Sequence, residues 1–138
     1  MYESQFWRYV KNGMRNKWLE DRIETGSTKI GVPDIFYTMN DKMGWVELKV
    51  FNNLPKGENS IVKIKISPLQ VHWLTSRWKK NPGSTWMLAR RDSPKKTFYL
   101  FKGIDVIFTF TKSKFEETCH AKWDRQIDFD QLAFILQN

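Results

Sequence analysis

The chain has 138 residues, 41% of them hydrophobic, which argues against a disordered chain and against two ordinary globular units. It carries 23 Lys and Arg against 15 Asp and Glu, a net charge of +8, so a polyanionic partner such as nucleic acid is expected. A single cysteine excludes an internal disulfide framework and a cysteine-rich zinc site, and it suits a reducing compartment.

The first helical pattern spans residues 3 to about 19. Its apolar residues recur at spacings of three and four, as on one face of an amphipathic helix: Phe6, Trp7, Val10, Met14 and Trp18. Gly13 interrupts this pattern, because glycine weakens a helix interior. Residues 21–30 then mix turn formers with charges, and we expect a connection there that bends around a bound group such as a phosphate.

Two strands are predicted next, over residues 32–39 and 45–51, with a polar turn at 40–44 between them. Together they would form a hairpin. Residues 52–60 are rich in Asn, Gly, Pro and charge and are expected to form a loop. In residues 61–66, apolar side chains alternate with lysines.

A second helix is predicted from Ser67 to about Lys80. Ser can cap the first free amides of a helix, and Pro68 is tolerated at the first helical position. The residues that follow Lys80 are turn formers and end the helix: Asn81, Pro82 and Gly83.

Strands are predicted at 85–90 and 97–101, around a turn at 92–96, and a last helix at 128–136. This order of elements predicts an α/β fold in which a central mixed sheet is flanked by helices. Neither a repeat nor an internal boundary is visible, so residues 1–138 are expected to form a single domain.

Three polar residues of the hairpin can lie close together. Asp34 follows Pro33 in the first strand, and Glu47 and Lys49 occupy the second. Because alternate residues of a strand share a face, Glu47 and Lys49 point one way and Leu48 the other. Two converging carboxylates repel each other unless a cation lies between them, and oxygen ligands suit Mg²⁺ or Mn²⁺. The hairpin therefore predicts a metal site for phosphodiester hydrolysis, with Lys49 holding the nucleophile or balancing charge.

The acidic-x-Lys triplet alone is weak evidence for this site. About one or two such triplets are expected by chance in a chain of this length. The alternative is a cross-strand ion pair on a solvated face. What favours a site is the conjunction: the triplet lies in an apolar strand, and Pro-Asp precedes it at hairpin distance.

These residues resemble the PD-(D/E)XK nucleases, whose signature is matched by Pro33-Asp34 and Glu47-Leu48-Lys49. The stretch RIETGSTKIGVPDIFY, followed by WVELKV, is similar to archaeal-type Holliday junction resolvases and to stand-alone VRR-NUC nucleases of bacteria and phages. The segment SPLQVHWL resembles the latter. The resemblance covers about residues 3–101 and implies a restriction-endonuclease-like nuclease core there, with 102–138 as a C-terminal extension.

The resemblance also implies roles for single residues. Asp34, Glu47 and the backbone carbonyl of Leu48 would be metal ligands, and Lys49 the catalytic lysine. Gln70, one turn into the second helix, would lie near the metal or the scissile phosphate; its alternative is an exposed surface position.

The first helix of these relatives contributes a further acid, which Glu3 matches here. An ordinary charge at a helix N-terminus is the alternative for Glu3. Glu20 and Glu24 compete for the role because they are closer to Asp34 in sequence, and periodicity does not choose among the three.

Contacts to DNA are expected in two regions. Ser27 matches the small hydroxyl residue of the resolvase loop, where it would touch a phosphate, and Arg22 and Lys29 add charge beside it. Lys63, Lys65 and Arg77 belong to basic clusters of the kind that follow a DNA backbone.

We therefore expect a Mg²⁺-dependent endodeoxyribonuclease, with Mn²⁺ as the other suitable ion, that cuts branched DNA such as Holliday junctions in recombination and repair. Symmetric cutting of a four-way junction needs two active sites, so a homodimer is expected. The alternatives are a non-catalytic basic DNA-binding module and a restriction-type endonuclease that reads a specific sequence.

A membrane partner is not expected. No apolar run approaches the roughly 20 residues that cross a bilayer. The N-terminal residues also lack the continuous hydrophobic segment of a signal peptide. We expect a soluble protein in the cytoplasm of a bacterial or phage-infected cell.

Overall fold

One sheet organises the part of the chain that the computed structural model describes, residues 3–23 and 31–138. Its strands in this part are β1 (Leu19–Arg22), β2 (Ile35–Met39), β3 (Lys42–Phe51), β4 (Thr85–Arg91), β5 (Thr97–Lys102) and β6 (Ala121–Asp124). They lie in the sheet in chain order. β3 and β4 run parallel, and the other neighbours are antiparallel. The predicted mixed sheet is confirmed.

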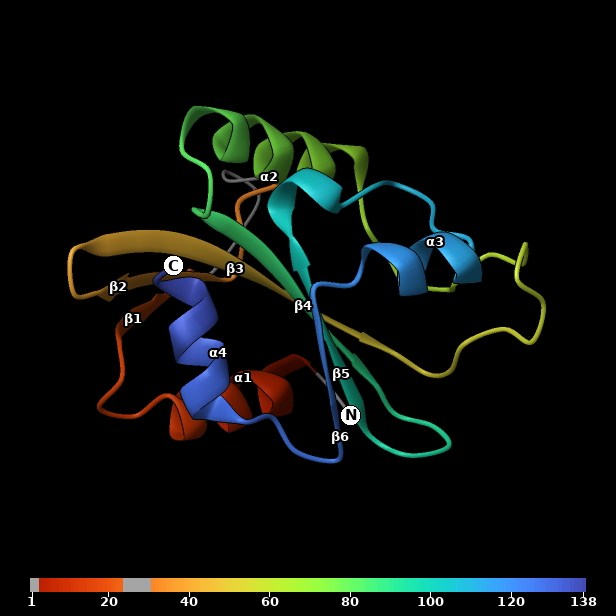
Figure 1. The fold of residues 1–138 in the computed structure, drawn as a ribbon, viewed down its shortest axis with the longest axis horizontal. Coiled ribbons are helices and arrows are strands. Elements are labelled where there is room, and N and C mark those ends of the chain that lie inside the picture. The colour runs from red at the N-terminus through yellow and green to blue at the C-terminus, as the bar shows by residue number, and fades with distance from the viewer. Residues whose placement is uncertain (1–2, 24–30) are drawn as a thin grey trace.

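Helices cover both faces of the sheet (Figure 1). The helices α2 (Pro68–Lys80), η1 (Gly103–Asp105) and α3 (Lys112–Thr118) lie on one face, and α1 (Glu3–Gly13) and α4 (Phe129–Leu136) on the other. A parallel strand pair needs a long crossover, which here is the segment between β3 and β4 that contains α2. No helix of the described residues is long and apolar enough to cross a lipid bilayer.

Each face of the sheet has its own hydrophobic core. Leu48 of β3 packs with residues of α1 and α4 in one core, whereas Phe51 packs with α2, α3 and the 61–66 segment in the other. Because side chains alternate along β3, Glu47 and Lys49 share the face of Phe51. The two charged residues are therefore buried on the side covered by α2, opposite to Leu48, as predicted.

The β2–β3 hairpin is confirmed, but its turn is shorter than predicted. Met39 pairs with Lys42, so the turn consists of Asn40 and Asp41, and residues 42–44 belong to β3. Asn40 adopts a left-handed conformation with φ 56°, which asparagine tolerates and a two-residue hairpin turn requires. The first strand begins at Ile35 rather than at residue 32.

The predicted helix over residues 3–19 is wrong at its C-terminal end, because α1 ends at Gly13. A Cβ atom at Gly13 would lie 2.1 Å from the Phe129 ring, so the close packing of α4 requires glycine there. Met14 and Trp18 follow the helix and are still buried in the same core, which explains the apolar pattern. Residues 19–22 form β1, where a bent connection was expected from residue 21 onward.

The segment 102–138 contributes to the same sheet and core. β6 pairs with β5, and Leu132 and Leu136 of α4 are buried against α1 and the sheet. The Tyr37 hydroxyl of β2 donates to the carbonyl of Leu136 at 3.0 Å. The predicted helix at 128–136 is confirmed; Asp128 caps it by accepting from the Gln131 N–H.

The start of α2 is fixed by a capping box. The Ser67 hydroxyl accepts from the Gln70 N–H at 3.1 Å, and the Gln70 side chain accepts from the Ser67 N–H at 3.0 Å. These bonds satisfy amides that a helix start otherwise leaves free. The helix predicted from Ser67 to Lys80 is therefore confirmed at both ends.

We expect Ser67→Ala to lower the free energy of unfolding by about 1 kcal/mol, because it removes the acceptor at the helix start. Urea denaturation followed by circular dichroism measures the change. Ser76→Ala, in the interior of the same helix, serves as the control and should leave stability unchanged or slightly raised. Equal effects of the two substitutions would contradict the capping role.

Candidate active site

Asp34 lies where β3 continues past the end of β2. The pairing of the two strands ends at Ile35 and Val46. Beyond that point the backbone N–H of Leu48 donates to Asp34 Oδ2 at 2.8 Å. The Asp34 backbone carbonyl accepts from the Ile23 N–H at 2.6 Å. The Asp34 carboxylate thus accepts the hydrogen bond that a backbone carbonyl of a neighbouring strand would otherwise accept, and this bond holds it against β3.

The backbone carbonyl of Leu48 faces the same edge of β3 as Asp34. In an extended strand, the N–H and C=O of one residue project to the same side, and the next residue projects to the other side. The Trp45 N–H, three residues earlier, bonds to Ser84 on the β4 side, which fits this alternation. A second oxygen ligand is therefore available beside the Asp34 carboxylate.

Glu47 and Lys49 are both buried, with 4% and 8% of their surface exposed. Glu47 Oε2 lies 3.4 Å from Lys49 Nζ and accepts from Gln70 Nε2 at 3.1 Å. These partners replace the water that the carboxylate loses on burial. Gln70 therefore links the start of α2 to the site, and its place near a metal or the scissile phosphate stays a prediction.

The acidic groups of the site hold their protons more tightly than exposed acids. Burial raises the pKa of Glu47 to about 8, and repulsion from Asp34 adds to this, whereas Lys49 opposes it. Burial also raises the pKa of Asp34, against the lowering effect of the Leu48 N–H. When both of these neighbouring carboxyl groups are ionised, their negative charges repel each other unless a cation binds between them.

The ligands present fit Mg²⁺ or Mn²⁺. Asp34, Glu47 and the Leu48 carbonyl offer oxygen atoms, which hard divalent cations prefer. Within residues 3–23 and 31–138, no group of three or more His, Cys, Asp and Glu side chains could hold a metal ion. Mg²⁺ commonly binds through one or two carboxylates and completes its shell with water and phosphate oxygens. The site therefore suits an ion shared with a bound phosphodiester.

Glu3 is the candidate third acid that acts on this site. It is exposed at the start of α1, and its charge raises the pKa of both Asp34 and Glu47. Glu20 lies in β1 and is not among the causes of either shift. Glu24 lies outside the described residues. Electrostatic proximity thus favours Glu3 over Glu20, and a role as metal ligand stays a prediction.

The predicted DNA-contacting residues lie at separate places. Lys63 and Lys65 are exposed on the 61–66 segment beside Lys49. Arg77 of α2 lies over the ring of Trp73 at 4.2 Å, and Arg22 of β1 lies 5.8 Å from the Trp7 ring. Ser27 and Lys29 lie outside the described residues.

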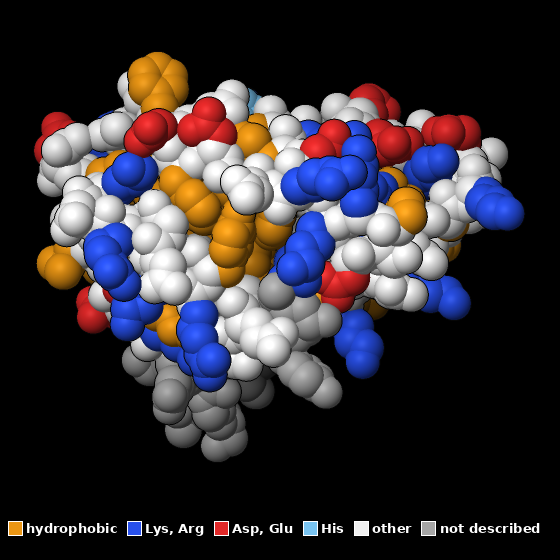
Figure 2. All heavy atoms as spheres, turned by 90° about the horizontal axis from the view of Figure 1, so that it is seen from below, with side chains coloured by type: hydrophobic (Ala, Val, Ile, Leu, Met, Phe, Trp, Pro, Cys, Tyr) orange, Lys and Arg blue, Asp and Glu red, His pale blue; other side chains and the backbone are white. Residues whose placement is uncertain are grey.

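Basic side chains are not confined to the surroundings of the site. On the face shown in Figure 2, Lys and Arg surround an apolar area, and most Asp and Glu side chains gather along one edge. Net charge by itself therefore does not locate a DNA-binding surface. Lys63 and Lys65 line one groove with Lys49, which contacts Glu47, and this position is the more specific guide.

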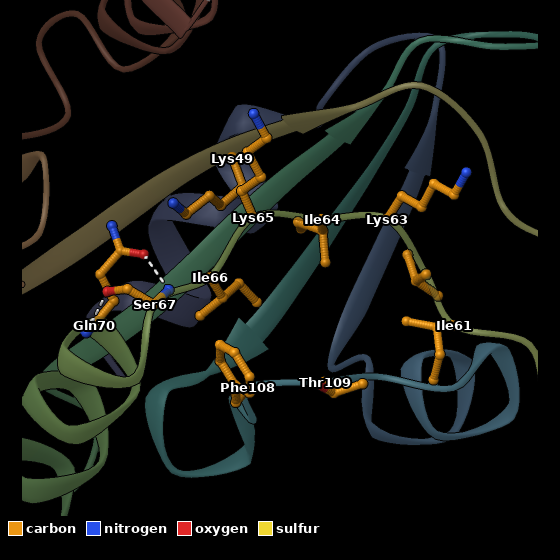
Figure 3. A pocket seen from close by; sticks show the side chains of 11 residues that line it. Lys49, Ile61, Lys63, Ile64, Lys65, Ile66, Ser67, Gln70, Phe108 and Thr109 are labelled. Atoms are coloured by element: carbon orange, nitrogen blue, oxygen red, sulfur yellow. Dashed lines mark hydrogen bonds between the residues drawn. The ribbon is translucent and has the colours of Figure 1, made fainter.

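Sequence reasoning missed one feature beside the site, a groove whose wall includes Phe108 (Figure 3). The alternation of residues 61–66 was the available signal. Val62, Ile64 and Ile66 are buried, and Ile61, Lys63 and Lys65 are exposed, although the segment forms only an isolated bridge between Ile61 and Thr111. Phe108 is about 40 residues farther along, and no local pattern connects it to the lysines.

Comparison with known proteins identifies the fold. No family model and no curated protein sequence matches the chain. Among solved structures it is similar to Hjc of Archaeoglobus fulgidus, a Holliday junction resolvase from an archaeal hyperthermophile. The TM-score is 0.61 at 13% identity, covering 94% of this chain and 98% of that one. At this identity the likeness shows the fold alone, and it confirms the restriction-endonuclease-like arrangement over nearly the whole chain.

Proposed function

We propose that this protein is a metal-dependent endodeoxyribonuclease. The observation that carries the proposal is the convergence of Asp34 and Glu47, both with raised pKa values, beside the buried amino group of Lys49. Raised pKa values and a charge partner in one place are typical of functional sites. The shared fold with a protein named as a Holliday junction resolvase supports DNA as the substrate.

In this proposal, Asp34, Glu47 and the Leu48 carbonyl would hold Mg²⁺ or Mn²⁺. When bound, the ion supplies Lewis-acid polarisation of the phosphodiester and a more acidic water. Lys49 places a positive charge where the attacking oxygen and the phosphorane build up negative charge. Gln70 fixes the Glu47 carboxylate from α2 and so positions the ligand rather than reacting itself.

We further infer that the substrate is branched DNA, with the four-way junction as the first candidate. The support is the name of the structural neighbour, a Holliday junction resolvase, together with the motif resemblance to junction resolvases and VRR-NUC nucleases. Two cuts across one junction require two active sites, so a homodimer belongs to this proposal. A role in recombination or repair follows from the same substrate.

The second candidate is a non-catalytic DNA-binding module, favoured by the ion pair of Glu47 and Lys49, which Gln70 completes. In that case the buried pair would serve the fold alone. Buried ion pairs are often no more stabilising than apolar residues of similar size. A purely structural role therefore explains less well why Asp34 adds a second carboxylate next to Glu47.

Cleavage assays separate these functions. A labelled four-way junction, a flap and a linear duplex are incubated with Mg²⁺ or with chelator, beside Asp34→Ala, Glu47→Ala and the control Lys96→Ala. We expect junction cleavage by the wild type and by Lys96→Ala in Mg²⁺, and none by the two site variants. Binding without cleavage would establish the non-catalytic module, and cleavage of linear duplex at one sequence would establish a restriction-type enzyme.

A further inference from the structure

A groove of about 620 Å³ opens beside the candidate active site. The 61–66 segment forms one wall, and the chain that carries Phe108 and Thr109 forms another (Figure 3). Lys49 and Gln70 line the groove and also contact Glu47. The groove is thus continuous with the site in which we place phosphodiester cleavage.

The groove combines an apolar interior with a basic rim. Figure 3 shows Ile64 and Ile66 projecting toward the chain that carries Phe108, and Lys63 and Lys65 projecting away from it. Phe108 is 58% exposed although it borders this apolar surface. None of the described residues that line the groove is acidic.

These properties match an unpaired stretch of a DNA strand better than a duplex. Lysines along a groove neutralise phosphates, and an exposed aromatic ring provides a stacking surface that any base can use. Bases inside a duplex are already stacked on each other and do not present their faces. A base that leaves the helix, as in a flap or an unpaired arm, does present its face.

We propose that the groove holds an unpaired nucleotide adjacent to the cleaved phosphate, with its base on Phe108 and its backbone beside Lys63 and Lys65. This inference rests on the proposed nuclease function and names the feature of the substrate that the enzyme selects. DNA with unpaired nucleotides next to the cut is then preferred over a continuous duplex. The selectivity comes from this groove and does not require recognition of a base sequence.

Binding measurements with Phe108→Ala test the inference. The probes are a single-stranded oligonucleotide, a fork with one unpaired arm and a fully paired duplex, all in chelator so that no DNA is cut. Phe134→Ala is the matched control, since Phe134 is also an exposed phenylalanine, at 64%, on α4. We expect Phe108→Ala to weaken binding of the single strand and the fork about tenfold, as for the loss of one stacked base. Duplex binding should change less than twofold.

The charged rim has its own readout. In the double variant Lys63→Ala and Lys65→Ala, the slope of log affinity for the fork against log salt concentration should become shallower by about one to two, which corresponds to the loss of one to two phosphate contacts. Lys96→Ala should leave this slope unchanged. An equal loss on all three probes, or no loss from Phe108→Ala, overturns the inference. Because these measurements need no metal, they stand apart from the cleavage assays. Selective loss of fork binding in a protein that cuts no DNA would overturn the nuclease proposal and leave the groove as a binding site for an unpaired nucleotide.

Discussion

Lys49→Met is expected to reduce the rate of DNA cleavage by roughly 10³-fold in single-turnover assays on a labelled four-way junction. Lys49 Nζ lies 3.4 Å from Glu47 Oε2, and its side chain is 10% exposed, so its charge acts in a poorly screened environment. Methionine keeps an unbranched apolar side chain of similar length and removes the charge. The fold should therefore persist while stabilisation of the transition state is lost.

The same variant distinguishes direct catalysis from an effect through the metal. The charge of Lys49 lowers the pKa of Glu47, so its loss also makes the Glu47 carboxylate harder to ionise and weakens metal binding. A rate that recovers at high Mg²⁺ would show that Lys49 acts through metal affinity. A rate that stays low at saturating Mg²⁺ would show that it acts on the reacting phosphate.

Lys96→Met provides the control, because Lys96 is exposed in the turn between β4 and β5. Its cleavage rate should equal that of the wild type. Circular dichroism and junction binding in chelator verify that Lys49→Met is folded and still binds DNA. A folded Lys49→Met enzyme with a rate within tenfold of the wild type would remove Lys49 from the proposed site.

The parts of the fold that could be predicted are those fixed by local chemistry. The opposite orientations of Leu48 and Glu47 follow from the two-residue period of a strand. The start of α2 follows from Ser67 and Pro68, whose capping and backbone preferences act within one turn. Both features are independent of the rest of the chain, which is why their positions agree with the structure.

The parts that were missed depend on contacts between distant residues. β1 and β6 are four-residue strands at the two edges of the sheet, and neither has the apolar pattern of a buried strand. Gly13, at the end of α1, packs against Phe129, more than 100 residues later in the chain. Such ends are set by tertiary packing, which a periodicity argument over 3–19 does not contain.

The sequence could predict which residues form the candidate site, but it could not predict their pKa values. Spacing placed Asp34, Glu47 and Lys49 on one hairpin, and the structure brings them together. The link from Glu47 to Gln70 depends on how α2 crosses β3, a tertiary feature. The raised pKa of Glu47 depends on its burial beneath that helix, so it could not be inferred from residue types alone.

Glu47→Gln is expected to change how stability depends on pH in the metal-free protein. The pKa of Glu47 is about 8 in the folded chain, against an ordinary value of 4.5. Below pH 4.5 the group is protonated in both states and has no effect. Between pH 4.5 and 8 the unfolded chain releases the proton while the folded chain keeps it, so stability falls as pH rises. Above pH 8 the full cost of the buried anion is present.

Glutamine at this position cannot titrate, and its side-chain oxygen can still accept from Gln70. Urea denaturation in chelator from pH 5 to pH 9 should therefore show wild-type stability falling relative to Glu47→Gln by about 2 kcal/mol or more. Glu117→Gln, at an exposed position on α3, should follow the wild-type profile. Parallel profiles for the wild type and Glu47→Gln would show that Glu47 is ionised throughout this range.

Adding Mg²⁺ or Mn²⁺ extends this prediction to the metal site. Ions bind the ionised form of Glu47, so binding must displace its proton and should strengthen from pH 6 to pH 9. The midpoint of thermal unfolding of the wild type should therefore rise with added metal at pH 9 and respond less at pH 6. Glu47→Gln should lose the response at both values, because one of the two carboxylates is gone. A metal response that is the same in the variant would place the ion elsewhere on the protein and separate Glu47 from metal binding.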